Sequence, residues 1–83
     1  MQLIDSSQAL GLYIRTARKT KGLSQQLLGR LAGVRQATVS NIERGEGGVS
    51  LATIFRVLAA LGLGMNLADK PGAVPAAGWR EEW

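Results

Sequence analysis

Apolar residues recur at helical spacing in four successive stretches of the chain, at about residues 6–21, 24–32, 36–44 and 51–61. This periodicity predicts four helices. The apolar positions expected to face a core are, helix by helix, Leu10, Ile14 and Ala17; Leu27, Leu28 and Leu31; Val39 and Ile42; and Leu51, Ile54, Leu58 and Leu61 with Phe55 beside them.

Hydrophobic residues also flank the expected helix starts at a fixed interval. Three pairs lie five residues apart: Leu23 with Leu28, Val34 with Val39, and Val49 with Ile54. This is the spacing of a hydrophobic staple, in which the residue before the N-cap packs against one in the first turn. It predicts caps at Ser24, Arg35 and Ser50, and Asp5 or Ser6 is expected to cap the first helix.

The third predicted helix has an unusual outward face. With Val39 pointing inward and about 100° per residue, the outward and flanking positions are Gln36, Ala37, Thr38, Ser40, Asn41 and Arg44. An ordinary surface helix carries Glu and Lys there, whereas these short polar and amide groups can reach base edges. Arg35 and Arg44 at its two ends can bind phosphates. The pattern favours a helix in a DNA major groove over a helical bundle with no DNA role.

A period of two replaces the helical period at residues 63–69, where Leu63, Met65 and Leu67 alternate with small or polar residues. This alternation predicts a short strand. Because no second strand is predicted, we expect it to pair with its copy in a second subunit. The alternative is an extended segment that lies on the core.

Residues 70–83 are rich in proline, glycine and alanine, and we expect them to form a flexible tail. The tail nevertheless contains Trp79 and ends on Trp83. Tryptophan is typical of binding segments because it fills a partner's pocket. Two alternatives remain, that Trp79 folds back on the domain or that the tail derives from an expression vector.

Composition narrows the class of function. The 83 residues include no cysteine and no histidine, which together with the small size argues against an enzyme. We expect no metal and no cofactor. The chain has no apolar run of about 20 residues and no signal-peptide pattern, so a soluble, cytoplasmic protein is expected.

The positive charge is concentrated in the helical part of the chain. Residues 1–62 contain eight basic and three acidic side chains, a net charge of +5, whereas residues 63–83 carry −1. A basic body suits the binding of a polyanion.

The stretch from Ser24 to Gly45 resembles the helix-turn-helix domain of the phage-repressor-like (XRE) family, and the resemblance covers roughly residues 8–62. The residues that carry it are Ser24-Gln25, Leu28, Gly33-Val34, Gln36, Ile42 and Glu43-Arg44-Gly45. Two positions depart from the family. Gly29 replaces the usual alanine and is expected to loosen a helix contact, and Arg35 replaces a capping Ser or Thr.

The resemblance implies an all-α fold of four helices, with residues 1–62 as the DNA-binding domain. The side chains expected to contact bases are Gln36, Ala37, Thr38, Ser40 and Asn41, and those expected to contact phosphates are Gln25, Arg35, Arg44 and Lys21. Gln25 is expected to brace Gln36 or to bond a phosphate itself. Arg18 is expected to form a structural ion pair with Glu43, the alternative for Arg18 being a phosphate contact.

The order of helix-turn-helix, short strand and tail ending in Glu-Glu-Trp resembles the HipB antitoxins. That resemblance implies a homodimer joined through Leu63, Met65 and Leu67, repression of its own operon at inverted-repeat operators, and binding of a HipA-type serine/threonine kinase toxin through Trp83 and Trp79. It also implies a bacterial protein that is nucleoid-associated when bound to its operator. There are two alternatives: a free-standing repressor, and a protein-interaction adaptor that does not bind DNA.

Overall fold

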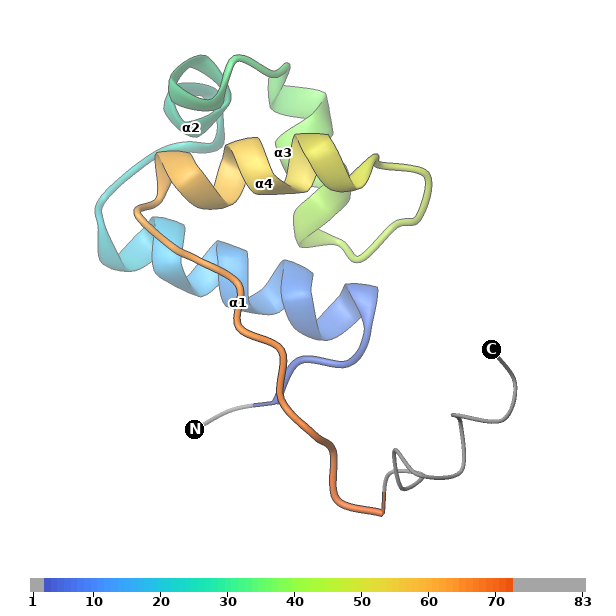
Figure 1. The fold of residues 1–83 in the computed structure, drawn as a ribbon. Helices are drawn as coiled ribbons and strands as arrows, with labels where there is room; N and C mark the ends of the chain where they lie inside the picture. The colour runs from blue at the N-terminus through green and yellow to red at the C-terminus, as the bar shows by residue number, and fades with distance from the viewer. Residues whose placement is uncertain (1–2, 73–83) are drawn as a thin grey trace.

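The computed structural model describes residues 3–72, which contain four α-helices (Figure 1). They are α1 (Ser7–Thr20), α2 (Gln25–Ala32), α3 (Gln36–Glu43) and α4 (Leu51–Ala60). Helix α3 packs against both α1 and α2, and α4 packs against α2. The predicted number and order of helices are confirmed.

Serine side chains begin three of the four helices. The hydroxyls of Ser6, Ser24 and Ser50 each accept a hydrogen bond from the backbone N–H three residues further on, at 3.0, 3.0 and 3.1 Å. Arg35 occupies the same position before α3 but makes no side-chain capping bond. Helix α3 therefore starts without the stabilisation that a capping side chain supplies, typically about 1 kcal/mol.

All four helices end in the same way. Each end contains a glycine with a positive φ of 70–76°. Gly33 is the C-cap of α2, and Gly22, Gly45 and Gly62 directly follow the C-caps of α1, α3 and α4. The next residue donates its N–H to the carbonyl five positions back, over 2.8–3.1 Å, at Leu23, Val34, Glu46 and Leu63. This pairing is the Schellman motif, which satisfies carbonyl groups that a helix end leaves free.

The core lies where the four helices meet. Its fully buried side chains are Ile14, Leu28, Val39, Val57 and Leu61. The three staple residues that precede caps, Leu23, Val34 and Val49, pack against this core. Their partners five residues later, Leu28, Val39 and Ile54, are buried, as the spacing predicts.

The core-facing residues predicted for α2 and α4 are wrong in part. Leu51 and Phe55 of α4 are 60% and 46% exposed, because the buried face of α4 is centred on Val57 and Leu58. Phe55 lies about 110° around the helix from that centre. In α2 the buried positions are Leu28, Gly29 and Ala32, so Leu27 and Leu31 point outward.

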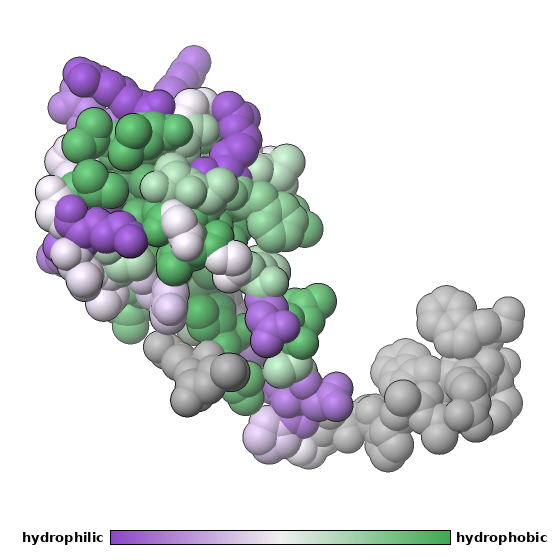
Figure 2. All heavy atoms as spheres, turned by 60° about the vertical axis from the view of Figure 1, so that its left-hand side comes forward, coloured by the Kyte–Doolittle hydropathy of each residue, from purple (hydrophilic) through white to green (hydrophobic). Residues whose placement is uncertain are grey.

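Part of the molecular surface is apolar. Figure 2 shows the side of the molecule where α2 and the end of α4 lie, and hydrophobic atoms cover much of it. The exposed large apolar side chains of the two helices are Leu27, Leu31, Leu51 and Phe55.

The chain after α4 runs past α1 toward the N-terminal arm (Figure 1), where Lys70 Nζ lies 3.1 Å from Asp5 Oδ2. Residues 63–70 form neither a helix nor a strand in this single chain. Leu63 packs on the core, whereas Met65 and Leu67 are exposed. The predicted strand needs a second subunit, and its pairing stays a prediction.

Candidate nucleic-acid interface

Helix α3 presents a buried and a polar side, as its sequence predicts. Val39 and Ile42 are buried in the core. On the other side, Gln36, Ala37 and Arg44 are exposed, and Thr38, Ser40 and Asn41 are partly exposed. The structure therefore brings together all five side chains predicted to contact bases, on one short helix.

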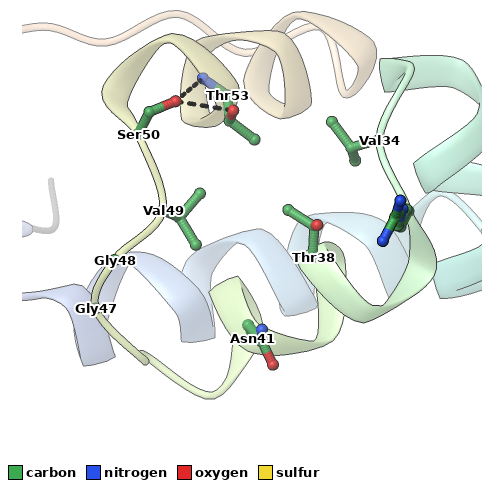
Figure 3. Close-up of a pocket in the computed structure, with 9 residues that line it drawn as sticks. Val34, Thr38, Asn41, Gly47, Gly48, Val49, Ser50 and Thr53 are labelled. Carbon is green, nitrogen blue, oxygen red and sulfur yellow. Dashed lines mark hydrogen bonds between the residues drawn. The ribbon is translucent and has the colours of Figure 1, made fainter.

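An open cleft of about 600 Å³ lies beside this face (Figure 3). Its lining residues are Val34, Arg35, Thr38, Asn41, Gly47, Gly48, Val49, Ser50 and Thr53. Thr38 and Asn41 extend from α3 on one side, and Ser50 and Thr53 stand at the start of α4 on the other. The cleft thus separates the predicted recognition helix from the N-terminal end of α4, where free backbone N–H groups favour an anion.

The inner side of α3 is anchored by a buried ion pair. Arg18 Nε donates to Glu43 Oε2 at 2.6 Å, and Arg18 Nη2 donates to Glu43 Oε1 at 3.0 Å. The two side chains are only 10% and 3% exposed. Arg18 Nη1 also donates to the carbonyl of Leu23, over 2.8 Å. The expected structural pair is therefore present, and it joins α1, the turn before α2, and the end of α3.

Burial and pairing act in opposite directions on the guanidinium of Arg18. Its hydrogen bond to Glu43 raises the pKa of Arg18 above its ordinary value, burial lowers it, and the charge of Glu43 raises it further. The net change is upward. Arg18 is accordingly a fixed positive charge, and its side chain, only 10% exposed and bonded to Glu43 and Leu23, offers little surface to a phosphate.

Gln25 joins this inner network instead of bracing Gln36. Its Nε2 donates to Glu43 Oε1 at 3.1 Å. The expectation that Gln25 holds Gln36 is therefore wrong for the free chain, because the buried carboxylate offers the Gln25 amide a charged acceptor. A phosphate contact by Gln25 stays a prediction.

The outer side of α3 carries a second network, which the sequence did not reveal. Arg44 Nε donates to Glu46 Oε2 at 2.7 Å, and Arg44 Nη2 lies 2.6 Å from the same oxygen. The guanidinium also donates to the side-chain oxygens of Ser40 and Asn41. In the free chain Arg44 is thus bonded to two other predicted DNA-contacting side chains, Ser40 and Asn41.

The other two predicted phosphate contacts lie at different places. Arg35 stands at the start of α3 and lines the cleft. Lys21 is the C-cap of α1 and is absent from the cleft lining. Arg35 and Arg44 therefore flank the recognition face, and Lys21 does not adjoin the cleft.

Glycines bring the helices next to α3 unusually close. A Cβ on Gly11 would lie 2.8 Å from the carbonyl oxygen of Glu43. A Cβ on Gly29 would lie 2.8 Å from the carbonyl oxygen of Val34. Gly29 was expected to loosen the helix contact, but here it permits a close approach of α2 to the turn. A glycine inside a helical pattern is a signal of such packing, and Gly11 could have been recognised by it.

The described helical part of the chain has more basic side chains than carboxylates to pair with them. Within residues 3–62 the three carboxylates belong to Asp5, Glu43 and Glu46, and each lies in an ion pair. The exposed cations without a carboxylate partner in the described part of the chain include Arg15, Lys19, Arg30, Arg35 and Arg56. Arg56 instead donates to the carbonyl of Gly33 at 2.9 Å.

Other kinds of site find no support in the described residues. Residues 3–72 contain no group of three or more His, Cys, Asp or Glu side chains that could hold a metal ion. In the same part of the chain, each helix is too short or too polar to cross a bilayer.

The chain matches known proteins over most of its length. Residues 14–67 match the family described as Helix-turn-helix. Antitoxin HipB of Escherichia coli O6:H1 is 36% identical over 84 residues, which cover 99% of this chain and 89% of the relative. Antitoxin HipB of E. coli strain K12 is 35% identical over 74 residues, covering 89% of this chain and 84% of the relative.

Solved structures agree with these relatives. A HipA-HipB-O2-O3 complex superimposes with a TM-score of 0.79 and 34% identity, covering 86% of this chain and 100% of the matched chain. The restriction-modification controller protein C.AhdI of Aeromonas hydrophila gives a TM-score of 0.65 and 36% identity, covering 70% and 84%. The chain therefore belongs to the helix-turn-helix family and, within it, to the HipB antitoxins.

Proposed function

We propose that this protein is a DNA-binding antitoxin that represses its own operon and binds a HipA-type serine/threonine kinase toxin. It binds inverted-repeat operators as a homodimer and is not an enzyme. The observation that carries the proposal is the outward face of α3, which presents amide, hydroxyl and cationic groups beside an open cleft. Solved relatives support it, because HipB is in complex with HipA and O2-O3 in one and with an O4 20mer in another.

Base contacts are assigned to the α3 side chains Gln36, Ala37, Thr38, Ser40 and Asn41. Gln36 can bond adenine through both atoms of its amide, and the methyl groups of Ala37 and Thr38 can contact thymine. Phosphate contacts are assigned to Arg35, Arg44, Lys21 and Gln25. Gln25 uses one N–H of its amide on Glu43, and the second N–H can donate to a phosphate.

Dimerisation is assigned to residues 63–69. Met65 and Leu67 are apolar and exposed, with Leu67 86% exposed, and the backbone of this segment has no strand partner among residues 3–72. Pairing with a second copy satisfies these backbone groups and buries both side chains. Leu63 contributes less than was expected, because its side chain already packs on the core.

The kinase contact is assigned to Trp83 and Trp79, which lie outside the described residues. It is tested by a pull-down from the native cell lysate with full-length protein and with a version that lacks residues 79–83. We expect a kinase to be retained by the first bait and lost or weakened with the second. Recovery of DNA alone by both baits would favour a free-standing repressor. Failure of the protein to bind any duplex at low salt would favour the remaining alternative, a protein-interaction adaptor that does not bind DNA.

A further inference from the structure

The end of α3 differs from the ends of the other three helices in one residue. Each helix end places a residue directly after its left-handed glycine, and that residue closes the Schellman motif. After α1, α2 and α4 it is Leu23, Val34 or Leu63, and all three pack against the core. After α3 it is Glu46, whose side chain is 52% exposed. A hydrophobic residue frequently accompanies this motif, so helix termination does not explain the carboxylate.

The carboxylate of Glu46 is held by a predicted DNA contact. It lies 2.7 Å from Nε and 2.6 Å from Nη2 of Arg44. The positive φ of Gly45, 76°, turns the chain between the two residues and lets the Glu46 side chain return to Arg44. Nη1 donates to Ser40 and Nη2 donates to Asn41, so all three nitrogens of Arg44 make a bond within the chain.

We propose that Glu46 competes with DNA phosphate for Arg44 and thereby limits the affinity of the protein for any duplex. The inference rests on the proposed function, since it concerns the surface that binds DNA. A phosphate that binds Arg44 through Nε and Nη2 displaces the Glu46 carboxylate, which then remains near the DNA backbone as a like charge. The pair is exposed, and it opens readily.

The same exchange releases two base-contacting side chains. While Arg44 is paired with Glu46, its guanidinium also occupies the oxygens of Ser40 and Asn41. Movement of Arg44 to a phosphate frees these oxygens to bond base edges. The arrangement therefore couples phosphate binding at the end of α3 to base reading along its face.

The test measures binding of the full-length protein to two fluorescently labelled duplexes over a series of salt concentrations. One duplex carries the DNA upstream of the protein's own gene, and the other has a random sequence. Glu46→Gln is expected to tighten binding to both by about two- to fivefold at low salt, the range expected for losing an exposed ion pair. It also steepens the salt dependence by up to about one unit, because Arg44 now reaches the DNA as an uncompensated charge.

Asp5→Asn is the matched control. It removes a carboxylate from another exposed pair, in which Lys70 and Asp5 are 59% and 52% exposed, against 58% and 52% for Arg44 and Glu46. We expect Asp5→Asn to give no gain in affinity for either duplex, because the partner of Asp5 is Lys70, which is not a predicted DNA contact. Glu46→Gln is then repeated in an Arg44→Ala background, where its gain should vanish.

Three results would overturn the proposal. They are no gain from Glu46→Gln, an equal gain from Asp5→Asn, and a gain that persists without Arg44. The last two would make Glu46 a general repulsive charge and not a competitor for Arg44. If the wild-type protein binds neither duplex, the proposed function itself fails. Wild-type binding with no effect of Glu46→Gln refutes this inference alone.

Discussion

Replacing Glu43 by glutamine is expected to destabilise the folded chain by about 3–5 kcal/mol, because it leaves the Arg18 guanidinium buried beside a neutral side chain. The carboxylate accepts three hydrogen bonds, two from Arg18 and one from Gln25. Glutamine has nearly the same shape but only one acceptor oxygen. Its NH₂ group then faces an N–H donor in a site where the carboxylate side chain is 3% exposed.

The expected loss is a large part of the free energy of unfolding of the whole chain. Small domains have free energies of unfolding of about 5–15 kcal/mol, and a chain of this size is expected near the lower end. Each kcal/mol lowers the melting temperature of such a domain by about 4–8 °C, so the variant should melt at least about 12 °C below the wild type.

Urea denaturation followed by circular dichroism measures the effect. All variants are compared at one protein concentration, because the stability of a dimer depends on concentration. Glu46→Gln is the control, since it removes a carboxylate from the exposed pair at the same end of α3 and should cost under about 1 kcal/mol. Arg18→Met and the double variant complete a mutant cycle. Additive losses in that cycle, or a loss under about 1 kcal/mol for Glu43→Gln, would refute the argument.

The pH dependence gives a second check on this pair. The pKa of Arg18 is raised in the folded chain, so its stabilising charge is fully present below the ordinary pKa of arginine. It is lost only as the pH rises through the raised value. The stability difference between wild type and Glu43→Gln should therefore persist from neutral pH to about pH 10. A difference that fades over this range would show that the guanidinium is not held as a charge by Glu43.

Three further substitutions test the packing of α3 and its DNA face. Gly11→Ala should destabilise the chain by about 1–3 kcal/mol, because the new methyl group meets the carbonyl oxygen of Ile42; Gly64→Ala, which meets nothing within 4 Å, is its control in the same urea titration. Gln36→Ala should weaken operator binding by about 1–3 kcal/mol and leave random DNA unaffected, as fluorescence anisotropy would show. An equal loss on both duplexes would remove Gln36 from base reading. Arg44→Ala should weaken binding to every duplex and flatten the salt dependence. An unchanged slope would place Arg44 away from the phosphates.

Local rules explain what could be predicted from the sequence. A cap such as Ser24 and a terminating glycine such as Gly33 act on backbone groups within a few residues, so their roles can be deduced from sequence spacing alone. The inward placement of Val39 and Ile42 followed in the same way, because α3 contains no other large apolar residue.

Packing between helices decided what the sequence could not. Leu51 and Phe55 satisfy the helical period as well as Val57 does, but the neighbouring helix selects Val57 for the core. Similarly, the spacing of Gln25 and Gln36 gave no indication that a buried carboxylate would take the Gln25 amide. Such outcomes depend on the distance and angle between elements, which a single helical period does not contain.

The four residues from Glu43 to Glu46 explain why stability and recognition can be perturbed separately. Glu43 points into the core and is bonded to α1, while Arg44 points outward with Ser40 and Asn41. Gly45 lies against the backbone of α1, since a Cβ there would be 2.7 Å from Cα of Gln8. Helix α1 therefore fixes the end of α3 from the inside, through an ion pair and close backbone contacts, and leaves the outer side chains free to exchange partners. Changes at Glu43 should alter folding, and changes at Arg44 or Glu46 should alter DNA binding at a cost in stability of under about 1 kcal/mol.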